Sequence, residues 1–254
     1  MEKDTISAAA IEARLMAERD DAQSRHLMRF FKTGPGQYGE GDRFLGLKVP
    51  RTRAVVKEVK LRVTLPQIEL LLHSPWHEVR LCGLLLLVEE MKACGPRKND
   101  DHAVRLRKAE CRERIAAFYL KHARRANNWD LVDLSCQYIL GPYLRYSSAG
   151  NYDILKHLAQ STDLWEQRIA VVTTLDFVRN GALWPSLAIC DMLLSHNHDL
   201  IHKAVGWVLR EVGKRDKSVL TDYLDRNYSR MARTTLRYAI EKMDEAERRF
   251  WLHR

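Results

Sequence analysis

Trp76-His77-Glu78-Val79-Arg80-Leu81-Cys82 sets a pattern that returns twice, in Trp165-Glu166-Gln167-Arg168-Ile169-Ala170 and in Ile201-His202-Lys203-Ala204-Val205-Gly206-Trp207. Each stretch places a basic residue at the start of an amphipathic helix, followed by small and branched apolar residues. Arg168 and Lys203 are 35 residues apart, and Trp129 and Trp165 are 36 apart. A period of this size, with two helices per unit, is typical of helical repeats.

The repeat predicts an all-α fold, a right-handed α-solenoid of HEAT-like or armadillo-type helical pairs with a concave basic groove. A plain bundle of antiparallel helices would give a similar spacing, and the repeated basic position favours the solenoid. We expect a single domain over residues 1–254. Its parts are N-terminal helices with a glycine-rich loop over 1–49, repeats over about 50–243, and a short C-terminal helix over 244–254.

Helical periodicity runs through almost the whole chain, and no segment alternates as a strand does. The prolines fall at expected helix starts or breaks, Pro142 among them, except Pro35 in the glycine-rich loop. The expected helices cover residues 5–32, 50–61, 65–73, 76–94, 101–125, 128–140, 151–159, 163–179, 184–195, 199–214, 216–226 and 229–242, with a short helix to the end.

The charge balance favours a polyanionic partner, because the net charge is +9 and the pI is about 9.4. The longest apolar run, residues 81–88, is too short to span a bilayer. The start, Met1-Glu2-Lys3-Asp4, lacks an apolar signal core. We therefore expect a cytoplasmic protein, nucleoid-associated if it is bacterial.

Neither cysteine nor histidine spacing predicts a cross-link, a metal or a cofactor. The five cysteines are odd in number and widely spaced, so we expect most of them to be small apolar fillers of helix cores. Pro75 lies between His73 and His77, and His196 and His198 fall in an expected loop. The sequence therefore favours a chain without disulfides and without bound metal.

The segment Asn127-Asn128-Trp129-Asp130-Leu131-Val132-Asp133 indicates a chemistry. On a helix, Trp129 and Asp133 share one face, and an indole beside a carboxylate suits a planar cation. The basic run just before it, Lys121-His122-Ala123-Arg124-Arg125, suits an anionic polymer. A cationic feature within a polyanion describes alkylated DNA. The structural alternatives are a core tryptophan and an aspartate that stabilises a helix N-terminus.

A second basic run lies near the C-terminus, where Arg226, Arg230, Arg233 and Arg237 are spaced by four, three and four residues. This spacing predicts that the last three share a helix face after a Ser229 cap, as suits a phosphate backbone. The alternative is an ordinary solvated face.

Motifs of familiar active sites are missing from the sequence. The glycine-rich segment 33–42 lacks P-loop spacing, so we expect a flexible connection, with phosphate contact by its amides as the alternative. There is no H-E-x-x-H, no glycine-flanked serine elbow and no cysteine in a catalytic context. An enzyme of this sequence would rely on acid–base or electrostatic work by carboxylates.

At these residues the chain resembles the AlkD-like DNA alkylation-repair glycosylases, which are built of HEAT-like repeats. The resemblance covers roughly residues 25–240. Its landmarks are Phe44-Leu45-Gly46-Leu47-Lys48-Val49-Pro50, Trp129-Asp130-Leu131-Val132-Asp133, Trp165-Glu166-Gln167-Arg168 and Lys203-Ala204-Val205-Gly206-Trp207-Val208-Leu209-Arg210-Glu211.

The resemblance implies roles for single residues. Asp133 matches the aspartate that supports glycosidic-bond cleavage, and Arg168 matches an arginine that contacts DNA near the lesion. Trp129 and Trp207 match tryptophans that flank the lesion and its sugar. Phe30 stands where some members carry a tyrosine, a change expected to weaken DNA contact without abolishing the chemistry.

The implied function is a monofunctional DNA N-glycosylase of base excision repair. It would release cationic N3-alkyladenine and N7-alkylguanine from double-stranded DNA, as a monomer without metal or cofactor. No lysine stands out as an amine nucleophile, so no lyase step is expected. The expected DNA contacts are Phe30, Lys203, Arg124, Arg125, Arg230, Arg233 and Arg237. The alternatives are a non-catalytic HEAT-repeat DNA-binding module and a protein-interaction scaffold whose binding is insensitive to salt.

Overall fold

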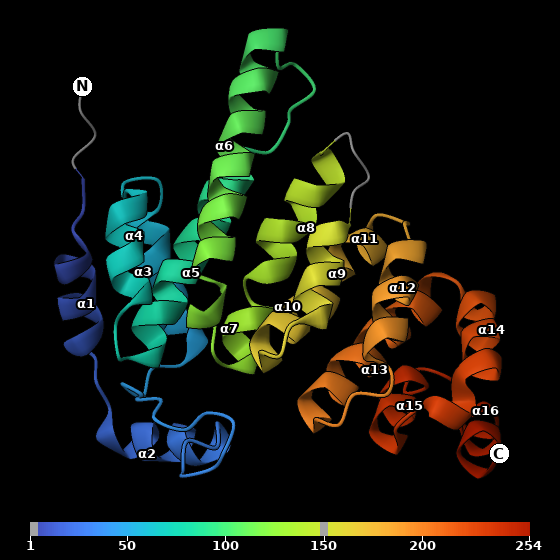
Figure 1. The fold of residues 1–254 in the computed structure, drawn as a ribbon. Coiled ribbons are helices and arrows are strands. Elements are labelled where there is room, and N and C mark those ends of the chain that lie inside the picture. Colours follow the sequence, from blue (N-terminus) through green and yellow to red (C-terminus); the bar gives the residue numbers. More distant parts are fainter. Residues whose placement is uncertain (1–4, 148–151) are drawn as a thin grey trace. The chain divides into compact units, whose positions relative to one another are not determined.

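The computed structural model describes residues 5–147 and 152–254. Over these residues the chain is all-helical, and the only β-type pairing among them is an isolated bridge between Arg43 and Trp76 (Figure 1). None of the described helices is long and apolar enough to cross a membrane. Residues 1–4 and the expected helix start at 151 lie outside the described residues.

The helices fall into two compact units, Met1–Ile139 and Leu140–Arg254. The all-α prediction is confirmed, and an α-solenoid is consistent with it. The expected single domain over 1–254 and its concave groove stay predictions.

The first unit is organised around one buried helix. Its elements are α1 (Ala8–Met16), α2 (Asp21–Phe30), α3 (Val49–Val59), α4 (Leu65–Leu72), α5 (His77–Ala93), α6 (His102–Lys121), the 3-10 turn η1 (Ala123–Arg125) and α7 (Trp129–Asp133). Helix α5 packs against α1, α3, α4, α6 and α7. Its residues from His77 to Val88 are all buried, as expected of a helix that is apolar around its circumference.

Helix α8 (Cys136–Tyr146) leads from the first unit into the second. The second unit contains α9 (Asp153–Gln160), α10 (Leu164–Thr173), α11 (Leu175–Arg179), α12 (Trp184–Leu193), α13 (Asp199–Arg215), α14 (Lys217–Asn227), the 3-10 turn η2 (Tyr228–Arg230), α15 (Arg233–Ala239) and α16 (Glu245–His253). Helix α13 is its centre and packs against α10, α11, α12, α14 and α15.

Three expected helices are broken in the structure, and polar side chains explain the breaks. The helix expected over 5–32 stops at Met16 and restarts after Asp20, whose carboxylate accepts hydrogen bonds from two amides at the start of α2. The Ser135 hydroxyl donates to the Leu131 carbonyl between α7 and α8. The Thr174 hydroxyl donates to the Val171 carbonyl between α10 and α11. Such bonds compete with the helical ladder.

Pro142 was expected to start or break a helix, but it lies inside α8. Proline removes one backbone donor from the ladder, and α8 continues past it to Tyr146. The preceding Gly141 allows the close approach of α8, because a Cβ there would lie 2.4 Å from the Cβ of Asp176. Packing between helices therefore outweighs the tendency of proline to break a helix.

The arginine row near the C-terminus is also interrupted. The helix expected after a Ser229 cap is wrong, because Ser229 lies in η2 and α15 begins only after Ala232. Arg233 and Arg237 are exposed on one face of α15, four residues apart, whereas Arg230 ends η2. Only two of the three guanidinium groups therefore share a helix face.

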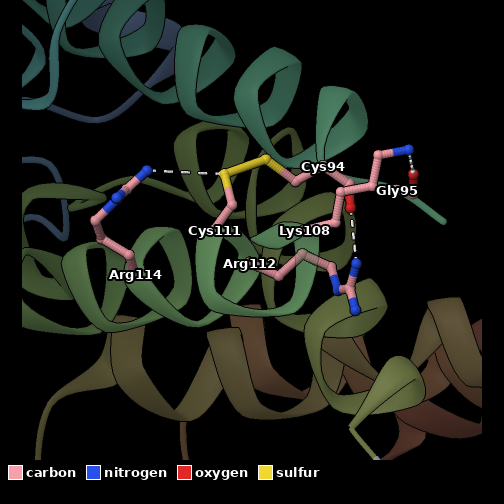
Figure 2. The surroundings of a disulfide bond; sticks show 6 residues. All are labelled: Cys94, Gly95, Lys108, Cys111, Arg112 and Arg114. Carbon is pink, nitrogen blue, oxygen red and sulfur yellow. Dashed lines mark hydrogen bonds between the residues drawn. A yellow bond between two sulfur atoms is a disulfide. The ribbon is translucent and has the colours of Figure 1, made fainter. Parts of the chain in front are cut away.

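A disulfide joins α5 to α6, contrary to the expectation from the cysteine spacing. Cys94 is the C-cap of α5, and Cys111 lies 17 residues later on α6, with Cα atoms 6.2 Å apart (Figure 2). Arg112 donates to the Cys94 carbonyl at 2.7 Å beside this bond. The sequence separation hid the pair, because α6 returns along α5. Cys82, Cys136 and Cys190 are buried, as predicted, and take no part in this disulfide.

Reducing this disulfide is expected to lower the free energy of unfolding by about 3 kcal/mol, because the bond closes a loop of this length in the unfolded chain. Urea unfolding with and without dithiothreitol measures the effect. A Cys94→Ser/Cys111→Ser double variant is the control, and the reductant should leave its unfolding midpoint unchanged. Equal midpoints for the oxidised and reduced wild type would contradict the prediction.

Candidate active site

Helix α7 presents the tryptophan and the aspartate that the sequence singled out. The Asn128 side chain caps it by accepting from the Trp129 amide at 2.9 Å. The half-buried Trp129 ring stacks on Phe31, with centroids 5.2 Å apart and planes within 16°. Phe30 contacts the same indole edge-on at 6.0 Å. The start of α7 is therefore held by aromatic packing against the end of α2.

An aromatic cavity of about 420 Å³ opens beside α7. Phe30, Phe31, Trp129 and Asp133 all contribute to its lining. The predicted shared face of Trp129 and Asp133 is thus confirmed geometrically, since both border one space. The lining also includes Glu78, Asp130, His77 and Lys48. Aromatic rings beside a carboxylate form a site that suits a flat, positively charged group.

Beneath this wall lies a buried charge network that the sequence analysis missed. His77 begins α5, and its Nε2 lies 2.8 Å from Asp130 Oδ2 on α7. Its Nδ1 lies 2.8 Å from Asp42 Oδ2, and Arg80 donates to the other oxygen of Asp42 at 2.6 Å. The four side chains are all buried. Two carboxylates and two cations balance in charge, and they fix α7 to α5.

The charges determine the protonation of His77. Burial lowers the pKa of this imidazole, but the carboxylates of Asp130 and Asp42 outweigh burial and raise it to about 9. Burial raises the pKa of Asp42, and the opposing effects of His77 and Arg80 bring it below its usual value. His77 is therefore a buried imidazolium at neutral pH.

A third buried carboxylate shapes the loop that borders the cavity. Glu78 accepts hydrogen bonds from the amides of Leu45, Gly46 and Leu47 at 2.8, 2.9 and 3.0 Å. Gly46 has φ +94°, and a Cβ there would lie 2.1 Å from the Asp20 carbonyl oxygen. Only glycine fits this turn, which explains its place in the sequence landmark.

The glycine-rich segment 33–42 is a folded connection that delivers Asp42 to the network. Gly36 and Gly41 have φ of +73° and +78°, in the region that favours glycine. The Gly36 amide donates to the Glu40 carboxylate at 2.9 Å. The sequence signal for the network was the polar run His77-Glu78 at the start of an otherwise apolar helix.

In the second unit, Arg168 lies on α10 and is 5% exposed. Its Nη1 donates to the Leu200 carbonyl at 2.5 Å, in the first turn of α13. Arg168 therefore joins α10 to the start of α13 through its guanidinium.

Helix α13 carries Lys203 and Trp207 four residues apart on one face. Trp207 is half-buried, and Lys203 forms an ion pair with Asp199 at 2.8 Å. At Gly206 a Cβ would lie 2.5 Å from the Cβ of Tyr238, so the glycine permits close packing of α13 against α15. The landmark sequence around Gly206 thus reflects packing as well as surface chemistry.

The structure brings three of the predicted residues together in the first unit. Phe30, Trp129 and Asp133 meet at the cavity of the first unit. The two basic residues just before α7 differ in exposure. Arg124 is exposed, whereas Arg125 is half-buried and donates to the Leu72 carbonyl at 2.8 Å. The second unit carries Arg168, Lys203, Trp207, Arg230, Arg233 and Arg237.

The family model described as "DNA alkylation repair enzyme" matches residues 11–243. This chain belongs to that family. The resemblance inferred from the sequence landmarks is thereby confirmed. Among solved structures, the fold is similar to a predicted DNA alkylation repair enzyme from Enterococcus faecalis, with a TM-score of 0.64 and 14% identity. That match covers 89% of this chain and 97% of the other. No curated protein matches.

Membership of the DNA alkylation repair enzyme family assigns a DNA-repair role to the chain. At 14% identity the solved structure supports the shared fold alone.

Proposed function

We propose that this member of the family is a monofunctional DNA N-glycosylase that releases cationic N3-alkyladenine and N7-alkylguanine. The observation that carries the proposal is the cavity wall shared by the Trp129 indole and the Asp133 carboxylate. A cationic purine is already a good leaving group, so its release requires no strong acid. The protein must instead stabilise the positive charge that develops on the sugar.

In the proposed reaction, the bond between C1′ and the purine nitrogen breaks and its electron pair neutralises the base. The sugar becomes oxocarbenium-like, and the Asp133 carboxylate stabilises it electrostatically. Water, oriented by Asp133, then adds to C1′ and releases its proton to the solvent. The Trp129 face contributes cation–π attraction to the cationic groups. Trp207 is proposed to contact the lesion or its sugar, and Arg168 to position α13.

DNA binding by the exposed arginines predicts a steep dependence on salt. Neutralising about six phosphates would lower affinity about a thousandfold between 50 and 200 mM salt. Fluorescence anisotropy with a labelled duplex measures this slope. An Arg233→Gln/Arg237→Gln variant should show a shallower slope, whereas Arg249→Gln on α16 serves as the control. Salt-insensitive binding by the wild type would instead favour a protein-interaction scaffold.

The direct test is release of free base from DNA treated with a methylating agent, resolved by chromatography. We expect the wild type to release 3-methyladenine and 7-methylguanine while leaving the strand intact. Unmethylated DNA is the matched substrate control. Intact DNA binding without release of either base would overturn the glycosylase proposal in favour of a non-catalytic binding module.

A further inference from the structure

The C-termini of α4 and α6 converge on three side chains that carry ligand atoms for a metal. Glu69 lies on α4, His73 is the C-cap of α4 and His122 is the C-cap of α6. One ligand atom of each lies within 4.8 Å of the others. The spacing of His73 and His77 gave poor support for a metal, because Pro75 lies between them. In the structure His73 instead meets the ring of His122, with centroids 5.7 Å apart.

We propose that Glu69, His73 and His122 bind a divalent transition metal of the Zn²⁺ class, at a site apart from the cavity beside α7. Two imidazoles and a carboxylate are a ligand set that Zn²⁺ takes readily, and water completes a tetrahedron. Tetrahedral bonds to Zn²⁺ place ligand atoms about 3.3 Å apart. His122 Nε2 and Glu69 Oε1 are already 3.2 Å apart. The exposed His73 side chain closes the remaining distance by rotation.

The buried His122 gives an independent reason for a cation here. This residue is 7% exposed, and its Nε2 makes no hydrogen bond although a carboxylate oxygen lies beside it. A buried polar atom without a hydrogen bond costs stability unless another partner satisfies it. A metal bound at this point would satisfy both atoms.

The charges around the three side chains both favour and oppose a bound cation. Two helix C-termini each contribute about half a negative charge, which adds to the carboxylate in favour of a cation. Lys121 opposes metal binding, because its Nζ lies 3.1 Å from Glu69 Oε1. The Lys121 side chain is 66% exposed and is free to turn into solvent. Arg125 already donates to the Leu72 carbonyl at the end of α4.

Titration of the tag-free, chelator-treated full chain with zinc sulfate by isothermal calorimetry tests the site. We expect one Zn²⁺ per chain, with His73→Gln and Glu69→Gln each weakening binding at least about tenfold. Lys121→Gln should tighten binding. His26→Gln, which removes an exposed histidine on α2, is the matched control and should bind as the wild type does.

A Co²⁺ titration supplies a second readout, because tetrahedral Co²⁺ absorbs visible light far more strongly than octahedral aqueous Co²⁺. The wild type should develop these bands and His73→Gln should lose them, with both proteins folded by circular dichroism. The proposal is overturned if the wild type takes up no equivalent of Zn²⁺. It is equally overturned if His73→Gln and Glu69→Gln bind with wild-type affinity.

Discussion

Replacing Asp133 by asparagine is expected to lower the rate of base release by about 100- to 1000-fold. The substitution keeps the size of the side chain on the cavity wall but removes its negative charge. If that charge stabilises the oxocarbenium-like sugar, the loss falls on the chemical step and leaves DNA affinity close to wild type. Single-turnover release of 7-methylguanine, with duplex affinity measured in parallel, separates the two quantities.

The matched control for this change is Asp222→Asn, which removes an exposed carboxylate on α14. Its base release should equal that of the wild type. If Asp133→Asn retained the wild-type rate while remaining folded, Asp133 would have no electrostatic role. A parallel loss of DNA affinity would instead assign Asp133 to binding.

What the sequence predicted well was local. Trp129 and Asp133 are four residues apart, so helical geometry alone places them on one face, and both line the same cavity. The all-α architecture likewise follows from periodicity repeated along the chain. The family resemblance rested on runs of adjacent residues and is confirmed by the match over residues 11–243.

What the sequence did not reveal depends on contacts between distant residues. His77 meets Asp42 and Asp130 across 35 and 53 residues, and no local spacing signals such pairing. The pairing of Cys94 with Cys111 likewise required knowing that α6 returns along α5. Hydrogen bonds from the Ser135 and Thr174 hydroxyls to preceding carbonyls end helices that the hydrophobic periodicity predicted to be continuous. Such bonds act within a single helical turn, so the longer-range periodicity does not reveal them.

The buried network links the stability of the first unit to its proposed chemistry. Asp130 and Asp133 belong to one short helix, and five residues of α7 provide little helix stability of their own. The ion pair between Asp130 and His77 therefore helps to hold Asp133 at the cavity. A positioning role of this kind differs from contact with substrate. The dependence of folding stability on pH tests the positioning role, because it follows the charge on His77.

Replacing His77 by leucine is expected to lower the free energy of unfolding by about 3–5 kcal/mol. The change leaves the carboxylates of Asp42 and Asp130 buried without their shared cation, although Arg80 still pairs with Asp42. Urea unfolding at pH 7 measures the loss. His26→Leu, which removes an exposed histidine on α2, should change stability little. Adding Asp130→Asn to His77→Leu should recover part of the loss, because it removes one stranded charge.

The pH dependence of the free energy of unfolding shows whether the protonated form of His77 stabilises the fold. The pKa of His77 is raised from 6.5 to about 9, so its contribution is fully present below pH 6.5 and is lost as pH rises through 9. The shift corresponds to about 3 kcal/mol. Wild-type stability should fall over this interval, and His77→Leu should lack that fall. If both proteins lost the same stability between pH 6.5 and 9, the charge on His77 would not hold α7 in place.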